Sequence, residues 1–487
     1  MSTNTITTAS EFELVSGLEI HVQLNTNTKI FSSDSASFGA KPNEHISPVS
    51  LALPGALPKL NKAVVEKAVK MGLALNCTIN QRNYFDRKNY FYADLPKGYQ
   101  ITQDNLPICQ GGYIEVTLGN GSVKRIGINR IHLEEDAGKS MHDQNDRYSY
   151  VDLNRAGVPL IEIVTEADIR SSEEASALLT EMRKLVRHLD VSDGNMEEGS
   201  LRCDANISIR KSGTTAFGTR CEVKNLNSIR NVRRAMDFEF NRQVDVVTEG
   251  GTIIQSTLNF DAENGTTSPM RSKEMANDYR YFPDPDLPPM VLSDQWLDRV
   301  KAAMPALPSQ ITQELMENYN ISNGEASLLA GDAELLAFFY KGVEAVKHKK
   351  SLINWLVGPI RALLNERALS IAAYHVTPLQ LAEVINLCDD KKITQQVALQ
   401  QLLPAIENSQ QSNIPALAKS LNLWIEENDD ELEGFIDEVM AKYPAQVSAY
   451  KKGKKGVLGL FVGEVLKMAK GKADPQKVNI QVQKKLA

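Results

Sequence analysis

The chain has 487 residues, 42% of them hydrophobic, so it is long enough for several domains that each bury a core. Its 54 Lys and Arg residues against 61 Asp and Glu residues give a net charge of -7, which excludes a generally basic nucleic-acid binder but allows one basic module. Five widely spaced cysteines without a C-x-x-C pair argue against a disulfide framework, and no apolar run approaches the roughly 18 residues of a membrane span. We therefore expect a cytoplasmic, multidomain protein without a membrane partner.

The stretch 17–24, GLEIHVQL, alternates apolar residues with Glu19 and His21, which predicts a half-buried strand. A lone Glu-x-His pair more often lies on a surface than binds a metal. A carboxylate and an imidazole on one strand face can nevertheless share a cation. Residues 84–103 combine tyrosines and phenylalanines with Lys88 and Lys97, and this segment is either core or a loop that stacks a base and binds phosphate.

The stretch 125–140 changes the phase of its apolar residues. Ile126 and Ile128 belong to one phase and Ile131 and Leu133 to the other, so we expect a β-bulge near Asn129. The strand ends in three consecutive acidic residues, 134–136, which repel one another unless water or a cation neutralises them. Residues 171–189 then predict an N-capped amphipathic helix, with acidic residues in its first turn and basic residues in its last.

The stretch 197–210, EEGSLRCDANISIR, alternates most regularly. Its polar phase contains Arg202, Asp204 and Asn206, which resemble oxygen ligands beside a phosphate-binding cation more than an ordinary solvated face. With the other strands, this pattern predicts one antiparallel sheet whose polar face is a charged site. The chain lacks both G-x-x-x-x-G-K-[ST] and G-x-G-x-x-G, so a nucleotide would be held by side chains and metal.

Together these strings resemble one family along nearly the whole chain. With FDRKNYFYADLPKGYQI, HLEEDAGKS, DLNRAGVPLIEIV and DYRYFPDPDLPP, they are similar to the B subunits of the glutamine-dependent aspartyl-tRNA(Asn)/glutamyl-tRNA(Gln) amidotransferases, the GatB/GatE family. The resemblance implies an α+β fold, with a cradle domain around an antiparallel β-sheet, an all-α helical domain and a small helical YqeY-like tail. We place these domains at 1–292, 293–408 and 409–487.

The resemblance also implies the reaction. ATP phosphorylates the side-chain carboxylate of aspartate or glutamate misattached to tRNA, and ammonia displaces phosphate to leave Asn-tRNA(Asn) or Gln-tRNA(Gln). The ammonia comes from glutamine, which an amidase partner hydrolyses within a heterotrimer that also contains a small third subunit. The implied partners are therefore this amidase, the small third subunit, and misacylated tRNA, and the implied cofactors are ATP and Mg²⁺.

Phosphoryl transfer between anionic groups needs a metal ion and cationic side chains. The candidate catalytic residues and metal ligands are Glu19, His21, Glu134, Glu135 and Asp204, with Ser200 as support. The candidates for holding ATP are Lys88, Tyr90, Arg202, Asn206, Lys224 and Arg271, and Tyr99 could frame a base. Where some relatives carry a C-x-x-C, this chain has Ser47 and Ser50, so no zinc is expected.

The remainder of the chain, from about residue 293, has a helical pattern and a charged tail. Residues 425–438 carry eight acidic residues, whereas residues 450–487 contain ten lysines and two acidic residues. The lysines are either a solvated helix face or a contact for the tRNA backbone. The candidate tRNA contacts are Lys451, Lys452, Lys454, Lys455, Lys467 and Lys470.

Two other functions compete with the transamidating subunit. A non-catalytic tRNA-binding scaffold would leave all chemistry to its partner, but it has no use for carboxylates clustered against an anionic ligand. A free-standing amide ligase would need its own source of ammonia, and the chain has no Gly- and Ser-rich amidase segment.

Overall fold

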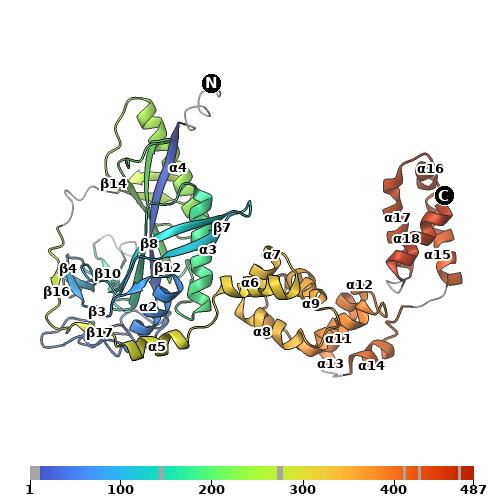
Figure 1. Cartoon of the computed structure of the whole chain (residues 1–487), viewed down its shortest axis with the longest axis horizontal. Coiled ribbons are helices and arrows are strands. Elements are labelled where there is room, and N and C mark those ends of the chain that lie inside the picture. Colours follow the sequence, from blue (N-terminus) through green and yellow to red (C-terminus); the bar gives the residue numbers. More distant parts are fainter. Residues whose placement is uncertain are drawn as a thin grey trace. The chain divides into compact units, whose positions relative to one another are not determined.

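The computed structural model describes residues 11–141, 147–270, 278–409, 413–425, 429–469 and 473–486. The chain divides into two compact units, Met1–Leu307 and Pro308–Ala487 (Figure 1). Apolar residues of the first unit form one core cluster, and those of the second unit form two. The α+β class expected from the sequence is confirmed, because a large sheet with helices forms the first unit and helices form the second.

The main sheet of the first unit has ten strands, counted over the described residues. Its order is β15 (Thr266–Pro269), β14 (Ser256–Asp261), β13 (Cys221–Lys224), β12 (Leu201–Lys211), β1 (Phe12–Gln23), β11 (Pro159–Thr165), β8 (Val123–Glu135), β6 (Cys109–Gln110) and β2 (Thr78–Ile79), and β7 (Tyr113–Thr117) also pairs with β8. The expectation of a wholly antiparallel sheet is wrong at one pair, because β13 and β14 run parallel. A parallel pair needs a crossover, which helix α4 (Ile229–Thr248) supplies here.

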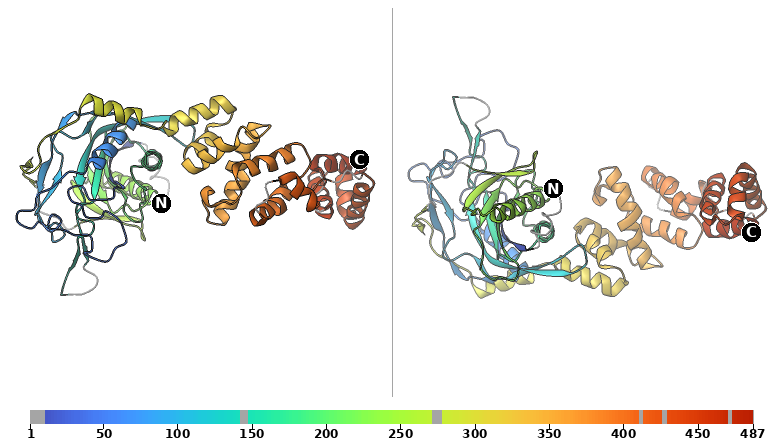
Figure 2. Two further views of the ribbon diagram at one scale, coloured as in Figure 1. Left: turned by 90° about the horizontal axis from the view of Figure 1, so that it is seen from below. Right: turned by 90° about the horizontal axis from the view of Figure 1, so that it is seen from above.

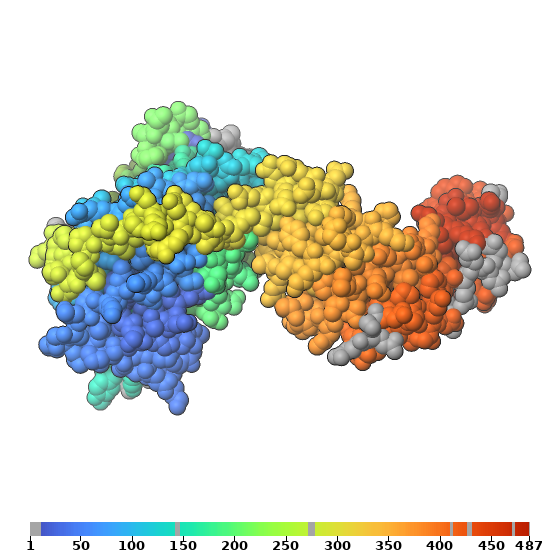
Figure 3. All heavy atoms as spheres, turned by 60° about the horizontal axis from the view of Figure 1, so that its bottom comes forward, coloured from blue at the N-terminus to red at the C-terminus, as the bar shows by residue number. Residues whose placement is uncertain are grey.

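Three smaller sheets and the remaining helices complete the first unit. The sheets are β16 (Phe282–Pro283) with β4 (Asp86–Asn89) and β5 (Tyr99–Thr102), then β9 (Lys139–Met141) with β10 (Tyr150–Asp152), and β3 (Arg82–Asn83) with β17 (Met290–Val291). The helices are α2 (Lys62–Ala74), α3 (Ser172–His188) and α5 (Asp294–Ala302), besides α4. Helix α5 packs against α2 on the surface of the unit (Figure 3).

One face of the main sheet is apolar and is covered by helices. Helices α3 and α4 lie along this face (Figure 2), and α4 packs on β12. The apolar residues of the central strands, such as Ile20, Cys203, Ile161 and Leu133, are buried in the same cluster as residues of these helices. The alternation along each strand therefore turns the polar residues toward the opposite face, where the candidate site lies.

The predicted β-bulge in β8 is confirmed at Asn129. Val164 of β11 pairs with Arg130 and the next residue, Thr165, pairs with Ile128, so Asn129 is the extra residue. Before the bulge the even-numbered Ile126 and Ile128 face the core, and after it the odd-numbered Ile131 and Leu133 do. The bulge therefore turns Arg130, His132 and Glu134 toward the polar face.

The second unit is helical. Its elements are α6 (Pro308–Tyr319), α7 (Asn323–Ala330), α8 (Ala333–Gly342), α9 (Lys349–Trp355), η1 (Leu356–Ile360), α10 (Arg361–Glu366), η2 (Ile371–Ala373), α11 (Pro378–Asp389), α12 (Gln395–Val397), η3 (Ala398–Leu402), α13 (Leu403–Ser409), α14 (Ile414–Ser420), α15 (Asp429–Lys442), α16 (Pro444–Lys451), η4 (Lys455–Val457), α17 (Leu458–Met468) and α18 (Pro475–Leu486). No helix among the described residues combines the length and apolar character that crossing a membrane requires.

The two core clusters of the second unit divide the helices between them. The first cluster runs from Ile311 to Leu423 and includes α14, whereas the second joins α15 to α18. In the second cluster Phe461 and Val465, four residues apart on α17, are buried on one face of the helix. The compact units meet at 307/308, whereas the sequence placed its first boundary at 292/293, before α5.

Candidate active site

A pocket of about 380 Å³ lies against the polar face of the main sheet. Strands β1, β8, β11, β12 and β13 contribute one wall, and β4 with the segments that follow β5 and precede β16 contributes the other. The lining contains six carboxylates, Glu19, Asp104, Glu134, Glu162, Asp204 and Glu222. Three lysine and arginine side chains, Lys88, Arg130 and Lys224, line the same pocket, so its composition is strongly acidic.

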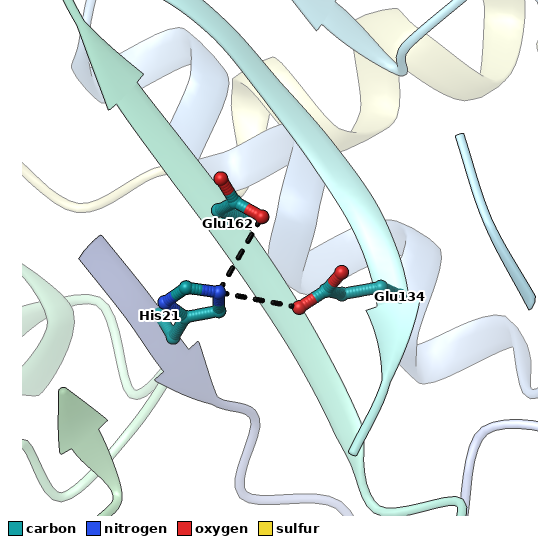
Figure 4. A group of neighbouring side chains, drawn as sticks. All are labelled: His21, Glu134 and Glu162. Atoms are coloured by element: carbon teal, nitrogen blue, oxygen red, sulfur yellow. Dashed lines mark ion pairs between the residues drawn. The ribbon is translucent and has the colours of Figure 1, made fainter. Parts of the chain in front are cut away.

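Four of these residues form a cluster that crosses three strands. Glu162 of β11 pairs laterally with His21 of β1 on one side and with His132 of β8 on the other. His21 Nε2 lies 3.4 Å from a Glu162 oxygen and 3.5 Å from a Glu134 oxygen (Figure 4). His132 Nε2 lies 3.2 Å and 3.7 Å from oxygens of the same two carboxylates. The ligand atoms of His21, Glu134 and Glu162 are close enough together to hold one metal ion.

Burial and charge set the protonation of this cluster. Burial lowers the pKa of His132, but the carboxylates of Glu162 and Glu134 outweigh it and raise this pKa to about 9. The pKa of His21 is raised by the same two carboxylates against its own burial. Burial raises the pKa of Glu162, yet the two histidines hold this pKa well below its usual range. His132 and Glu162 therefore form an ion pair at neutral pH.

A second group of carboxylates lies beside the first. Glu19 of β1 pairs laterally with Asp204 of β12, and Glu222 of β13 completes a set whose oxygens all lie within 4.8 Å of one another. Lys224 Nζ lies 2.7 Å from an oxygen of Asp204 and of Glu222, and Asn206 donates to Glu19 at 2.9 Å. Burial, followed by the charge of Glu162, raises the pKa of Glu19. Clustered carboxylates of this kind would be stabilised by a cation.

Four of the six side chains in the two groups were predicted as site residues from the sequence. The structure brings together Glu19, His21, Glu134 and Asp204, and places Lys224 and Asn206 beside them. It does not bring Glu135 to this pocket, because adjacent residues of a strand point to opposite faces. Glu135 instead forms an ion pair with Lys97 and accepts a hydrogen bond from Ile101 N, in a separate pocket of about 220 Å³.

Other predicted residues lie away from the two carboxylate groups. Arg202 pairs laterally with His21, but its guanidinium lies 2.9 Å from Asp136. Tyr99 packs under Arg87 and lines the smaller pocket. Ser200 is buried, and its carbonyl oxygen accepts from Gln23 N. Arg271 and Lys470 lie outside the described residues.

An aromatic wall faces the carboxylates across the pocket. Tyr279 and Tyr281 line the pocket, and Lys88 Nζ lies 4.8 Å from the Tyr279 ring centroid. The predicted Tyr90 does not line the pocket, and its ring centroid lies 6.1 Å from that of Tyr279 in an edge-to-face arrangement. Burial, followed by the charges of Glu134 and Glu135, raises the pKa of the Tyr90 hydroxyl. Tyr279 and Tyr281 thus line this pocket, whereas Tyr90 and Tyr99 do not.

Ten lining residues of the pocket were not predicted as site residues, among them Arg130, His132, Glu162 and Glu222. Arg130, His132 and Glu222 are each in phase with polar residues of their own strands, and this was the signal that could have found them. Glu162 was missed because it is a single charge within PLIEIVT, where Leu160, Ile161 and Ile163 are buried. Its importance comes from lateral pairing with two other strands, which no single strand reveals.

The residues present fit a divalent cation. The group of Glu19, Asp204 and Glu222 offers carboxylate oxygens, which Mg²⁺ prefers, whereas the group of His21, Glu134 and Glu162 mixes oxygen with nitrogen. Ser50, one of the two serines where some relatives carry the C-x-x-C, serves another contact, and Cys109 is a buried thiol. The Ser50 hydroxyl bonds to Asp34, and burial raises the pKa of the Cys109 thiol well above its usual value. The expectation that zinc is not bound stays a prediction.

Comparison with known proteins decides the family. The GatB/GatE catalytic domain matches residues 14–298, which contain every lining residue of the pocket, and the GatB domain matches residues 337–486. The chain belongs to the GatB/GatE family. This confirms the resemblance seen in the sequence.

Relatives within the GatB/GatE family match nearly the whole chain. A protein of Syntrophotalea carbinolica is 47% identical over 477 residues, covering 98% of this chain and 99% of the relative. Relatives from Geotalea daltonii and Clostridium novyi are 46% and 45% identical, again covering 98% of this chain and 99% of their own lengths. All three are named as the B subunit of an aspartyl/glutamyl-tRNA(Asn/Gln) amidotransferase.

Proposed function

We propose that this chain activates the side-chain carboxylate of aspartate or glutamate on tRNA by phosphorylation with ATP, as the transamidating subunit of a glutamine-dependent ligase. As a GatB/GatE protein, the chain is a subunit of an amidotransferase that performs tRNA-dependent transamidation. The observation that carries the phosphorylation step is the pocket with two carboxylate groups facing Lys88 and an aromatic wall.

The proposed reaction has two steps. An oxygen of the substrate carboxylate attacks the γ-phosphorus of ATP, the bond to the ADP oxygen breaks, and an acyl phosphate forms. The nitrogen of ammonia then attacks the acyl carbon, the carbon–oxygen bond to phosphate breaks, and the amide is left on tRNA. A deprotonated carboxylate is already a nucleophile, so the first step needs no general base.

The side chains take their roles from position. Glu19, Asp204 and Glu222 would hold Mg²⁺, which supplies charge neutralisation on the transferring phosphoryl group. Asn206 and Lys224 keep these carboxylates in place, since Asn206 bonds to Glu19, and Lys224 to both Asp204 and Glu222. Lys88 places its ammonium group over the ring of Tyr279, where the phosphates or base of a nucleotide would lie. His21, Glu134 and Glu162 form the second, mixed-ligand group.

The finer architecture and the partners belong to the same proposal. They comprise the cradle, helical and YqeY-like domains at 1–292, 293–408 and 409–487, an amidase partner that acts as the glutaminase, a small third subunit, and a cytoplasmic location. The proposed tRNA contact is the group of exposed lysines in and around η4 and α17. Lys451, Lys452 and Lys454 of this group lie between the buried Tyr450 of α16 and the buried Phe461 of α17.

The test is amidation with free ammonium as the nitrogen donor, measured on the assembled amidotransferase. Asp204→Asn and Glu19→Gln should each lower this activity at least about 100-fold, because a metal contact is worth several kcal/mol in phosphoryl transfer. Glu13→Gln is the matched control on β1, since Glu13 pairs with Arg210 and does not line the pocket. Binding of Mn²⁺ alone, followed by electron paramagnetic resonance, should weaken in the two pocket variants and not in the control.

Two results would contradict the proposal. Wild-type ammonium-dependent activity in Asp204→Asn would remove this carboxylate from the phosphorylation step. An assembly that amidates tRNA while the chain binds neither Mn²⁺ nor ATP would favour the rival function, a tRNA-binding scaffold without chemistry.

A further inference from the structure

Arg130 is a cationic side chain of the pocket to which the two-step reaction above gives no role. It follows the β-bulge at Asn129 directly, and the bulge places it in phase with His132 and Glu134. Its side chain lines the pocket, where it lies near Tyr281. Burial and Asp104 raise the pKa of the Tyr281 hydroxyl, and the Arg130 charge acts in the opposite direction.

No carboxylate among the described residues lies within ion-pair distance of Arg130. Its lateral neighbours are Val164 on β11 and Gln110 on β6, which are both neutral. The nearest acidic residue of the facing strand, Glu162, is already engaged by two histidines. Arg130 Nε is enclosed and has no hydrogen-bond acceptor in the described part of the chain.

Three other partly buried arginines of this unit have carboxylate partners. Arg87 pairs with Asp284 and Asp286, Arg202 with Asp136, and Arg210 with Glu13. An enclosed Nε–H without an acceptor costs free energy that folding alone does not recover. A group held in this way beside a ligand pocket is therefore preorganised for an anion that arrives with the ligand.

We propose that Arg130 binds the transferring phosphoryl group, donating hydrogen bonds from its guanidinium to non-bridging oxygens of the ATP γ-phosphate. This inference rests on the proposed function of the pocket. The planar guanidinium matches two oxygens of a phosphate at once, which a lysine ammonium does not. Charge spreads over these oxygens during transfer, so the contact strengthens as the reaction proceeds.

The substrate carboxylate is the other anion in the pocket. A guanidinium bonded to that carboxylate would withdraw charge from the attacking nucleophile and slow the first step. The same guanidinium on the phosphoryl group stabilises charge where the reaction develops it. The two assignments differ in what Arg130 does to nucleotide binding, which allows a direct test.

The experiment compares the binding of two nucleotides that differ by one phosphate. Calorimetric titration of the full-length chain, with Mg²⁺ present, gives the affinities for the non-hydrolysable triphosphate AMP-PNP and for ADP. Arg130→Ala should weaken AMP-PNP binding about 10- to 100-fold, the worth of hydrogen bonds to a charged group, while ADP binding changes less than about three-fold. Arg125→Ala is the matched control on β8, because Arg125 is exposed and pairs with Glu115.

A second variant guards against loss of folding. Arg130→Lys keeps the charge but not the two-pronged geometry, and it should weaken AMP-PNP binding at least about five-fold with the circular dichroism spectrum unchanged. Unchanged AMP-PNP affinity in Arg130→Lys, or equal losses for AMP-PNP and ADP in either variant, would overturn the assignment. If the wild-type chain binds neither nucleotide, the proposed function fails instead, so the two failures are distinguishable.

Discussion

Lys29 is one of the largest side chains that the first unit buries completely. Its Nζ donates to the carbonyl oxygens of His45 and Leu153, at 2.7 Å and 3.2 Å. Burial lowers the pKa of this amine to about 8, although Asp34 and Glu135 act in the opposite direction. Because the hydrogen bonds need only an N–H donor, the neutral amine can make them as well.

The Lys29 pKa predicts a pH-dependent contribution to stability. The folded chain releases this proton near pH 8 and the unfolded chain only near 10.5, so between these values the unfolded state binds more protons. The free energy of unfolding of the wild type should therefore rise relative to Lys29→Met from pH 8 to pH 10. The gain should be at most about 3 kcal/mol, at about 1.4 kcal/mol per pKa unit.

Urea midpoints of the two full-length proteins at pH 7, 8, 9 and 10 measure this difference. The Lys29→Met variant is the reference because it keeps the length of the side chain and cannot titrate. A difference that stays constant over this range would mean that the Lys29 amine titrates at the same pH folded and unfolded.

At the scale of single residues, the sequence could predict whatever follows from alternation along one strand. Glu19, His21 and Asp204 were found in this way, and they share the pocket. Glu135 was included because three acidic residues are consecutive in the sequence, although consecutive residues of a strand cannot share a face. The role of Glu162 depends on which strands are neighbours, and lateral register is set by tertiary packing rather than by local pattern.

Among the secondary-structure elements, helices carry their boundaries in their own sequence. Ser171 was predicted as the N-cap of α3, and its hydroxyl accepts from Glu174 N at 3.1 Å. Thr377 caps α11 in the same way, with Gln380 completing a capping box and Pro378 in the first turn. Strand pairing has no comparable local signal, which is why the parallel β13–β14 pair was not anticipated.

The cap of α3 yields a stability prediction. Ser171→Ala should lower the free energy of unfolding by about 1 kcal/mol, because Glu174 N loses its acceptor at the start of the helix, whereas Ser171→Gly should cost only a few tenths. Ser176→Ala, within the same helix, is the control and should change stability by less than about 0.5 kcal/mol. Chemical denaturation of the full-length variants measures these values, and equal effects of Ser171→Ala and Ser176→Ala would rule out the cap.

For the whole molecule, the charge of the tail predicts how tRNA binding responds to salt. Lys451, Lys452, Lys454 and Lys455 are exposed, as expected for a phosphate contact, and Lys467 is exposed on α17. Replacing the first four by glutamine should weaken tRNA binding and lower the slope of log affinity against log salt by about 3, at roughly 0.7 to 0.9 per phosphate contact.

Filter binding on the assembled amidotransferase at several salt concentrations gives this slope. The control replaces four exposed lysines elsewhere, Lys62, Lys211, Lys301 and Lys341, so the change in net charge is the same. Equal slopes for the two quadruple variants would mean that the tail lysines are a solvated face. Deleting the tail from residue 409 onward would test the lysines less well than these substitutions. Helix α14 packs in the first core cluster of the second unit, and the deletion would remove it.

The overall organisation was predictable where composition changes along the chain. The change from strand patterns to helical patterns near residue 293 and the lysine-rich tail are both visible in the sequence. The position of α5 was not, because a helix that packs back on α2 has the same local pattern as one that begins a new domain. Contacts between distant segments decide such cases.

The bulge at Asn129 also bears on how this chain can change in length during evolution. Deleting that one residue would merge the two pairing registers of β8 into one, and either Ile126 and Ile128 or Ile131 and Leu133 would leave the core. If Ile131 and Leu133 stayed in the core, Arg130, His132 and Glu134 would still reach the pocket. If Ile126 and Ile128 stayed there instead, these three side chains would turn away from the pocket. Natural insertions and deletions in this region should therefore fall in the turn between β7 and β8, and the spacing from Asn129 to Glu134 should be kept constant.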